Sequence, residues 1–158
     1  MITIEFLRSR LATFNSLFNQ LLKHSLRPQE KNTMTGASYF VCGLLLTTLV
    51  FEKNITIAAL SILVISDTCA SIVGLTLGKY KLYGNKTLEG SAAFLFSATL
   101  ISLSLNSTLH LSFISLVLAS IGTSIIELFS KLLKIDDNLL IPLTFAMLYN
   151  VFFELFIV

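Results

Sequence analysis

Apolar residues fill five stretches of the chain, and short polar connections separate one stretch from the next. The stretches lie near residues 34–51, 55–78, 91–105, 109–133 and 139–158. A helix needs about 20 predominantly apolar residues to cross the hydrocarbon core of a bilayer. Because charged residues are rare inside the stretches, the pattern predicts about five transmembrane helices.

The first 26 residues follow a different pattern. Apolar side chains recur there at alternating steps of three and four, at Ile4, Leu7, Leu11, Phe14, Phe18 and Leu21. This spacing places them in one stripe of a helix, with Arg8, Asn15 and Lys23 elsewhere on its surface. We therefore expect residues 1–26 to form an amphipathic helix on the membrane surface or against the transmembrane helices.

The composition favours an all-α membrane protein. Of the 158 residues, 54% are hydrophobic and only 13% are charged, whereas a soluble domain carries about 25% charged residues. We therefore expect residues 1–158 to form a single integral membrane domain. The two cysteines and two histidines are isolated, without the spacing of a zinc site. The basic residues are not clustered with aromatic ones, so no nucleic-acid partner is expected.

Positive charge is distributed unevenly between the connections. Five spans would place residues 1–33, 79–90 and 131–137 on one side, and these ranges hold ten of the eleven basic residues. The other side would receive residues 52–54 and 106–108, with Lys53 alone. Basic connections remain cytoplasmic, so we expect a multi-pass protein of a cell or organelle membrane. Its N-terminus would be cytoplasmic and its C-terminus on the opposite side.

An acidic residue interrupts the second stretch. Asp67 lies near the middle of residues 55–78, where an ionised carboxylate is strongly unfavourable unless it faces protein, water, a metal or a counter-charge. Small residues at positions 70, 71, 74 and 78 share its helix face. They permit close helix packing, and they also allow a charged ligand to approach the backbone. We interpret Asp67 as a functional residue and keep both interpretations of the small residues.

The connection after this helix combines glycines with lysines. It has the sequence GKYKLYGNKTLEG from Gly78 to Gly90. Its lysines bring positive charge, and its last residues open a helix whose N-terminal N–H groups favour a phosphate. The sequence is not the phosphate-binding loop GxxxxGK[ST], because Asn85 follows Gly84. A phosphate-binding connection and a solvated cytoplasmic loop both fit this pattern.

A second acidic cluster precedes the last stretch. Asp136, Asp137 and Asn138 follow one another there, and Glu127 lies near the end of the fourth stretch. Carboxylate oxygens suit a hard cation, and Mg²⁺ typically binds one or two carboxylates together with substrate phosphates. Asn138 is alternatively the N-cap of the last helix, with Pro142 in its first turn.

In combination these segments resemble a known family. SDTCASIVGLTLGKYKLYGNKTLEGS followed by IDDNLLIP is similar to the polyprenol kinase family, which includes dolichol kinase, phytol kinase and the CTP-dependent diacylglycerol kinases. Bacterial members are often labelled phosphatidate cytidylyltransferase-like. The run LRPQEKNTMTGASYFVCG is similar to the family's segment before the preceding helix, so the resemblance covers roughly residues 26–148.

The resemblance implies a membrane lipid kinase. Such an enzyme transfers the terminal phosphate of CTP or ATP to a lipid alcohol of the polyprenol, phytol or diacylglycerol type, and we expect Mg²⁺ as its cofactor. Together with the residue chemistry above, it leads to four sets of expected site residues. They are Asp67, Lys86 and Glu89 for catalysis; Gly78, Lys79, Lys81, Lys86, Thr87, Gly90 and Asn138 for nucleotide binding; Asp67, Asp136 and Asp137 for the metal; and Arg27, Glu30 and Glu127 in support.

The chain departs from the family in one respect. Members usually have additional spans before the Arg-x-x-Glu segment, where only the amphipathic helix precedes Arg27 and Glu30. We therefore expect a short form of the family or a chain completed by a partner subunit, and its glycine faces also permit a homo-oligomer. Two alternative functions stay open. One is a cytidylyltransferase that makes a CDP-lipid, and the other is a small transporter or partner subunit without enzymatic activity.

Overall fold

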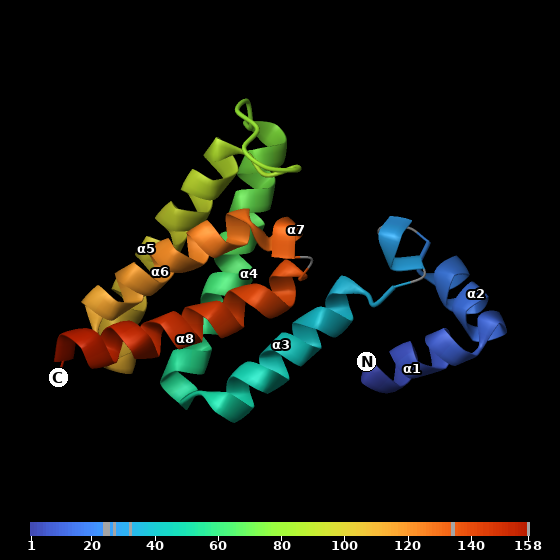
Figure 1. Cartoon of the computed structure of the whole chain (residues 1–158), viewed down its shortest axis with the longest axis horizontal. Coiled ribbons are helices and arrows are strands. Elements are labelled where there is room, and N and C mark those ends of the chain that lie inside the picture. Colours follow the sequence, from blue (N-terminus) through green and yellow to red (C-terminus); the bar gives the residue numbers. More distant parts are fainter. Residues whose placement is uncertain (24–25, 27, 32, 134, 158) are drawn as a thin grey trace. The chain divides into compact units, whose positions relative to one another are not determined.

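The computed structural model describes the whole chain except residues 24, 25, 27, 32, 134 and 158. No β-strand occurs among the described residues, which agrees with the predicted all-α membrane protein. In chain order (Figure 1) the elements are α1 (Ile2–Arg10), α2 (Ala12–Leu21), the 3-10 helix η1 (Pro28–Lys31), α3 (Gly36–Val50), α4 (Lys53–Thr76), α5 (Leu88–Leu109), α6 (Phe113–Leu128), α7 (Ser130–Leu133) and α8 (Asp137–Ile157).

The chain divides into two compact units. Residues 1–42 form the N-terminal unit, and residues 43–158 form the helical bundle. In the bundle, α4 packs on α5 and α8, and α6 packs on α5 and α8. Small residues allow this close packing, since five alanines are fully buried between the helices together with Phe94 and Phe145. These alanines are Ala58, Ala59, Ala98, Ala119 and Ala146.

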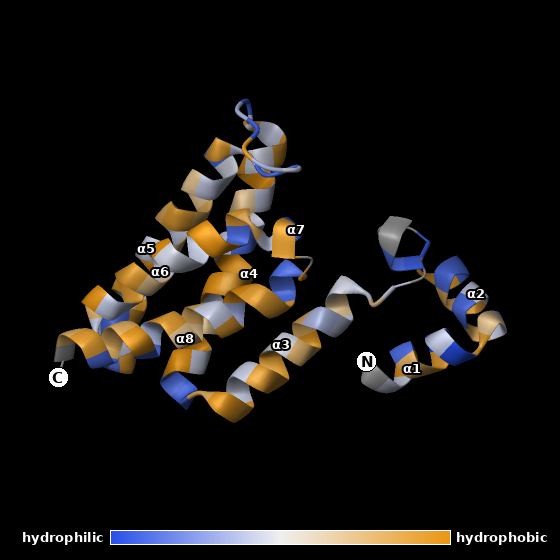
Figure 2. Ribbon diagram, in the orientation of Figure 1, coloured by the Kyte–Doolittle hydropathy of each residue, from blue (hydrophilic) through white to orange (hydrophobic). Residues whose placement is uncertain are grey.

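The outer surface of the bundle is apolar. Leu75 is 89% exposed and Phe96 is 67% exposed, although both side chains are large hydrophobes. Orange, hydrophobic residues cover most of the bundle helices in Figure 2, and blue residues gather at helix ends and connections. Exposed large hydrophobes over whole helices are expected where lipid replaces water as the solvent.

Three of the described helices are long and apolar enough to cross a membrane, namely α4, α5 and α8. The apolar helices α3 and α6 are shorter, with 15 and 16 residues. At 1.5 Å per residue they span about 23 Å, against about 30 Å for a hydrocarbon core. Five complete spans therefore stay a prediction.

Two helix boundaries differ from those expected. Residues 106–108 belong to α5, which continues to Leu109, and the connection to α6 lies at residues 110–112. His110 ends α5 in the left-handed conformation at φ 53°. The expected helix 109–133 is also interrupted, because α6 ends at Leu128 and α7 is a separate turn. Periodicity does not locate such breaks, because the residues on both sides of each break are equally apolar.

The connections of the bundle gather at two ends. At one end Asn54 Nδ2 donates a hydrogen bond to the Leu109 carbonyl at 3.1 Å, and the Ser112 N–H donates to Tyr149 Oη at 3.0 Å. At the other end Lys86 contacts Glu127 and Asp137. Within the bundle, the expected grouping of residues 79–90 with 131–137, opposite 52–54, therefore agrees with the structure.

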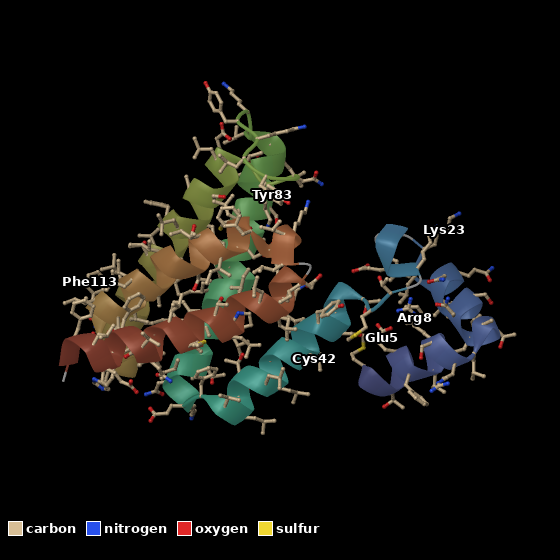
Figure 3. All side chains as sticks on the ribbon, viewed as in Figure 1. Glu5, Arg8, Lys23, Cys42, Tyr83 and Phe113 are labelled. Carbon is tan, nitrogen blue, oxygen red and sulfur yellow. The ribbon has the colours of Figure 1, made fainter. Side chains whose placement is uncertain are left out.

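The N-terminal unit contains two helices where one was expected. Leu11 separates α1 from α2 in an extended conformation, with φ −120° and ψ 104°. The break lets α2 fold back toward Arg8, whose side chain is buried. Arg8 donates to Glu5, to Asn15 and to the Glu30 carbonyl, and its guanidinium lies 4.4 Å from the centre of the Phe18 ring (Figure 3). A continuous helix would carry Phe18 about 15 Å along the axis from Arg8.

Pro142 lies inside α8 rather than in its first turn. Because proline has no N–H, the carbonyl of Asn138 lacks its usual partner one turn later. That carbonyl oxygen points at Gly43 of α3, where an added Cβ would lie only 2.5 Å from it. The proline and the glycine together let the backbone at Gly43 approach the start of α8 closely.

Candidate metal and nucleotide site

Three carboxylates from three different helices meet in the bundle. Asp67, Glu127 and Asp137 each offer one oxygen, and these oxygens lie within 4.8 Å of one another. We call these residues the carboxylate trio. Among the described residues they are the one such group of acidic, histidine or cysteine side chains. The sequence separates them by 60 and 10 positions, so only the helix packing brings them together.

Each member of the trio has a defined place on its helix. Glu127 lies in the last turn of α6 and is 2% exposed. Asp137 is the first residue of α8. Asp67 lies nine residues before the end of α4, which corresponds to a depth of about 14 Å along that helix. The last turns of α4 therefore extend beyond Asp67 toward the loop that joins α4 to α5, which lies at the top of Figure 1.

Lys86 joins the trio from the loop between α4 and α5. Its Nζ donates to Asp137 Oδ2 at 2.8 Å and also to Glu127 Oε1. Burial alone would lower the pKa of Lys86, but the adjacent carboxylates of Asp137 and Glu127 outweigh it and raise that pKa. The lysine is therefore charged at neutral pH and offsets one of the three formal negative charges.

The backbone of the loop explains how Lys86 reaches the trio. Lys81 and Thr87 form an antiparallel bridge, and the Lys86 N–H donates to the Tyr83 carbonyl at 2.9 Å to close a turn. Gly84 occupies this turn at φ 59°, in the left-handed region that favours glycine. The Tyr83 ring lies 6.5 Å from the Phe129 ring (Tyr83 is labelled in Figure 3), which holds the turn against the residue after α6.

Three residues expected to bind nucleotide hold α4 against α5. Thr87 caps α5, its Oγ1 accepting from the Gly90 N–H at 3.2 Å. A Cβ at Gly78 would lie 2.7 Å from Thr87 Cγ2, and one at Gly90 would lie 3.0 Å from the Ala70 carbonyl oxygen. The packing interpretation of these small residues therefore has direct support. Nucleotide contacts by Gly78, Thr87 and Gly90 stay a prediction.

Asp136 and Asn138 do not join the trio. Asp136 Oδ1 accepts from the Asn138 N–H at 3.0 Å and from Asn138 Nδ2 at 2.8 Å. Asp136 therefore caps α8, whereas Asn138 is its second residue. The alternative prediction of Asn138 as the N-cap is therefore wrong, because α8 begins at Asp137 and Asp136 caps it. Of the two aspartates expected to bind the metal, only Asp137 joins the trio.

The remaining expected residues lie in other surroundings. Glu89 accepts from the Tyr80 N–H at 3.3 Å and supports the loop. Lys79 and Lys81 are exposed on the same loop. Glu30 Oε1 accepts from the Gly36 N–H at 2.8 Å and caps α3 in the N-terminal unit. Arg27 lies outside the described residues.

The interior face of α6 contributes more to the site than the sequence pattern indicates. Glu127 was expected only in support, yet it is a full member of the trio. Thr123, one turn before it, and Ser66, next to Asp67, are both fully buried. Their hydroxyls have no hydrogen-bond partner among the described residues. The spacing of Thr123 and Glu127 on one face of α6 was the available signal.

The residues present suit a divalent cation. Opposite oxygens around Mg²⁺ are about 4.2 Å apart, and the oxygens of the trio all lie within 4.8 Å of one another. Glu127 Oε2 and Asp137 Oδ1 are buried and accept no hydrogen bond from the described residues. Buried carboxylate oxygens are expected to have a partner. A hard cation would provide one and would offset the remaining negative charge.

The chain is similar to known proteins over most of its length. The profile of the cytidylyltransferase family matches residues 3–134. CTP-dependent diacylglycerol kinase 1 of Schizosaccharomyces pombe is 30% identical over 92% of this chain and 73% of its own length. A protein of Triticum aestivum named "Probable phytol kinase, chloroplastic" is 33% identical over 73% of this chain and 43% of its own.

An uncharacterized protein of Rickettsia prowazekii is 32% identical over 94% of this chain and 75% of its own length. No solved structure matches the chain significantly. The family match and these relatives agree with the motifs read from the sequence. The chain belongs to the cytidylyltransferase family, among the polyprenol and lipid kinases.

Proposed function

We propose that this membrane protein transfers the terminal phosphate of a nucleoside triphosphate, CTP in the first place, to a lipid alcohol. The observation that supports this most directly is the convergence of the carboxylate trio with Lys86 at one end of an apolar bundle. CTP is preferred over ATP because relatives carry the name CTP-dependent diacylglycerol kinase.

Lys86 would bind the phosphates of the nucleotide. Phosphoryl transfer spreads negative charge over the equatorial oxygens, and preorganised positive charge stabilises it. The turn at Gly84 places Lys86 beside the trio, where its ammonium contacts two carboxylates and lies close to where the phosphates of a bound nucleotide would lie. Lys79 and Lys81 lie exposed on the same loop and would add attraction for the incoming nucleotide.

Asp67 would accept the proton of the lipid alcohol. It is the trio member on the long membrane helix α4, and it is half-buried. A carboxylate within hydrogen-bond distance of the hydroxyl orients and deprotonates it as the phosphate transfers. Glu89, the other expected base, supports Tyr80 in the loop, and we assign it to loop structure.

Glu127 and Asp137 would hold Mg²⁺ together with one oxygen of Asp67, which leaves the second Asp67 oxygen to accept the proton. When bound, this ion would neutralise phosphate charge and orient the nucleotide. The site would lie at the cytoplasmic edge of the membrane, where a soluble donor and a lipid acceptor meet. This location follows from the basic loop residues 79–87, with the N-terminus cytoplasmic, as the charge distribution predicts.

A second candidate is cytidylyl transfer, which the name of the matching family favours. That reaction joins the CMP part of CTP, through its α-phosphate, to the phosphate of phosphatidate, makes a CDP-lipid and releases pyrophosphate. Purified protein with Mg²⁺, CTP labelled at the α- or γ-phosphate and a panel of lipid alcohols and phosphatidate separates the two. Label from the γ-position in a lipid alcohol supports the kinase. Label from the α-position in the lipid establishes cytidylyl transfer instead, and no labelled lipid with either donor contradicts both.

A further inference from the structure

We propose that Lys86 is the resident counter-ion of the carboxylate trio. In the nucleotide-free protein its ammonium holds the position of the cation, and it moves to the phosphates when a metal–nucleotide complex enters. The inference rests on the proposed function and adds the form of the substrate that binds. The site takes the metal together with the nucleotide and binds the free metal weakly.

The first observation is the position of the ammonium. Lys86 Nζ contacts one oxygen of Glu127 and one oxygen of Asp137, two of the three members of the trio. A cation shared by these two residues would use the same oxygens. The lysine and a metal therefore compete for one place, because two positive charges within 4 Å repel each other strongly in a partly buried site.

The second observation is the set of atoms that Lys86 leaves unpartnered. Glu127 Oε2 and Asp137 Oδ1 are buried and have no partner among the described residues. Glu127 itself is 2% exposed. The ammonium thus satisfies part of the acceptor capacity, whereas a metal with phosphate and water ligands would use more of it. A point charge on a flexible stem suits such an exchange better than the rigid fork of an arginine would.

The third observation concerns the exposure of the Lys86 side chain and its location in a loop. Its side chain is 18% exposed, and it belongs to a loop rather than to a helix. Rotation of its stem would carry the ammonium away from the trio and toward the exposed part of its own loop, which includes Lys79 and Lys81. Nucleotide phosphates arriving there provide new acceptors. Metal and nucleotide therefore assist each other's binding, and the effect is reciprocal.

The experiment measures Mn²⁺ alone binding to the full chain in detergent micelles, by electron paramagnetic resonance, without nucleotide. Lys86→Gln is expected to bind Mn²⁺ about tenfold more tightly than the wild type, because the competing charge is gone. Lys131→Gln is the matched control. Lys131 is exposed next to Gly84 of the same loop and pairs with no carboxylate among the described ion pairs. Its removal should leave Mn²⁺ affinity unchanged. Equal or weaker Mn²⁺ binding by Lys86→Gln overturns the proposal.

Wild-type protein provides a test that does not depend on the folding of a variant. Mg²⁺ alone should raise the midpoint of thermal unfolding little, and Mg²⁺ with a non-hydrolysable CTP analogue should raise it clearly. An equal rise with Mg²⁺ alone contradicts the resident counter-ion. If wild-type protein phosphorylates lipid but Lys86→Gln gains no Mn²⁺ affinity, this inference alone fails. If wild-type protein neither responds to the metal–nucleotide complex nor phosphorylates lipid, the proposed function fails with it.

Discussion

Lys86 and Asp137 are 51 residues apart in the sequence, yet Lys86 Nζ donates to Asp137 Oδ2 at 2.8 Å. The contact ties the loop after α4 to the first turn of α8, and Glu127 of α6 shares the same ammonium. A substitution at this contact can therefore change both the chemistry of the site and the stability of the bundle. Every substitution here needs a stability measurement beside the activity measurement.

Glu127→Gln should destabilise the bundle and weaken metal binding. The amide keeps the shape of the side chain but removes a buried charge that faces Lys86. We expect a loss of about 1–3 kcal/mol, measured as unfolding in detergent micelles. Glu52→Gln, at the exposed start of α4 and at the opposite end of the bundle, is the control. Equal stability of both variants and wild type would contradict the ion-pair assignment.

Substitutions at Asp136 and Asp137 should have different effects. Those at Asp136 should change the stability of the bundle, and those at Asp137 should change the transfer activity. Asp136→Ala removes the cap of α8 and should lower stability by about 0.5–2 kcal/mol while transfer persists. Asp136→Ser retains a capping oxygen and should restore most of that stability. Asp137→Asn should retain the fold and lose most of the lipid phosphorylation. The assignment is wrong if Asp136→Ser abolishes transfer or if Asp137→Asn remains fully active.

Gly78→Ala should disturb the site from a distance. An added Cβ would lie 2.7 Å from Thr87 Cγ2, on a stiff β-branched residue that caps α5. Separation of α4 from α5 moves the loop that carries Lys86, so stability should fall by about 1–3 kcal/mol and activity should fall with it. Gly122→Ala meets only the flexible end of Leu148 and should be milder. A milder effect at Gly78 than at Gly122 would refute the packing role.

Local sequence patterns identified the acidic residue of α4 and the lysine loop as parts of the site. They did not identify which residues of other helices contact them. Asp67 was evident because a charge is rare in an apolar helix, and the lysine loop followed directly after it. The choice of Asp137 over Asp136 depends on the residue at which α8 begins, which residue types alone do not fix. In the sequence Glu127 lies four positions before Lys131, which is the spacing of an ordinary ion pair on a helix surface. Its contact with Lys86 arises only when α6 packs beside the loop.

In the N-terminal unit, helix periodicity wrongly predicted one continuous helix where the structure has two. Residues 1–26 carry an unbroken apolar stripe, and they contain no glycine or proline that would indicate a break near Leu11. The break arises from long-range contacts of Arg8, with Asn15 Oδ1 at 3.2 Å and the Glu30 carbonyl at 2.7 Å. Tertiary contacts of one buried guanidinium thus outweigh local helix propensity.

Acid should loosen the start of α3. Burial alone would raise the pKa of Glu5, but hydrogen bonds from Thr35 and Ser38 and the charge of Arg8 outweigh it and lower that pKa. The stabilisation by Glu5 is therefore present above its ordinary pKa of 4.5 and is lost as the pH falls below it. Hydrogen exchange at residues 36–42, corrected for intrinsic rates, should rise on acidification. Glu5→Gln should remove most of this pH dependence, and a wild-type response that persists in Glu5→Gln would contradict the assignment.

The most direct test of the central claim compares wild type with Asp67→Asn in transfer of γ-labelled phosphate from CTP to a lipid alcohol. Both proteins are purified, shown to be folded by thermal unfolding and assayed with Mg²⁺. Loss of the reacting carboxylate should lower the rate by at least about a hundredfold, while the bundle remains folded. Asp67→Asn with a rate near that of the wild type would contradict the assignment of the carboxylate trio as the catalytic centre.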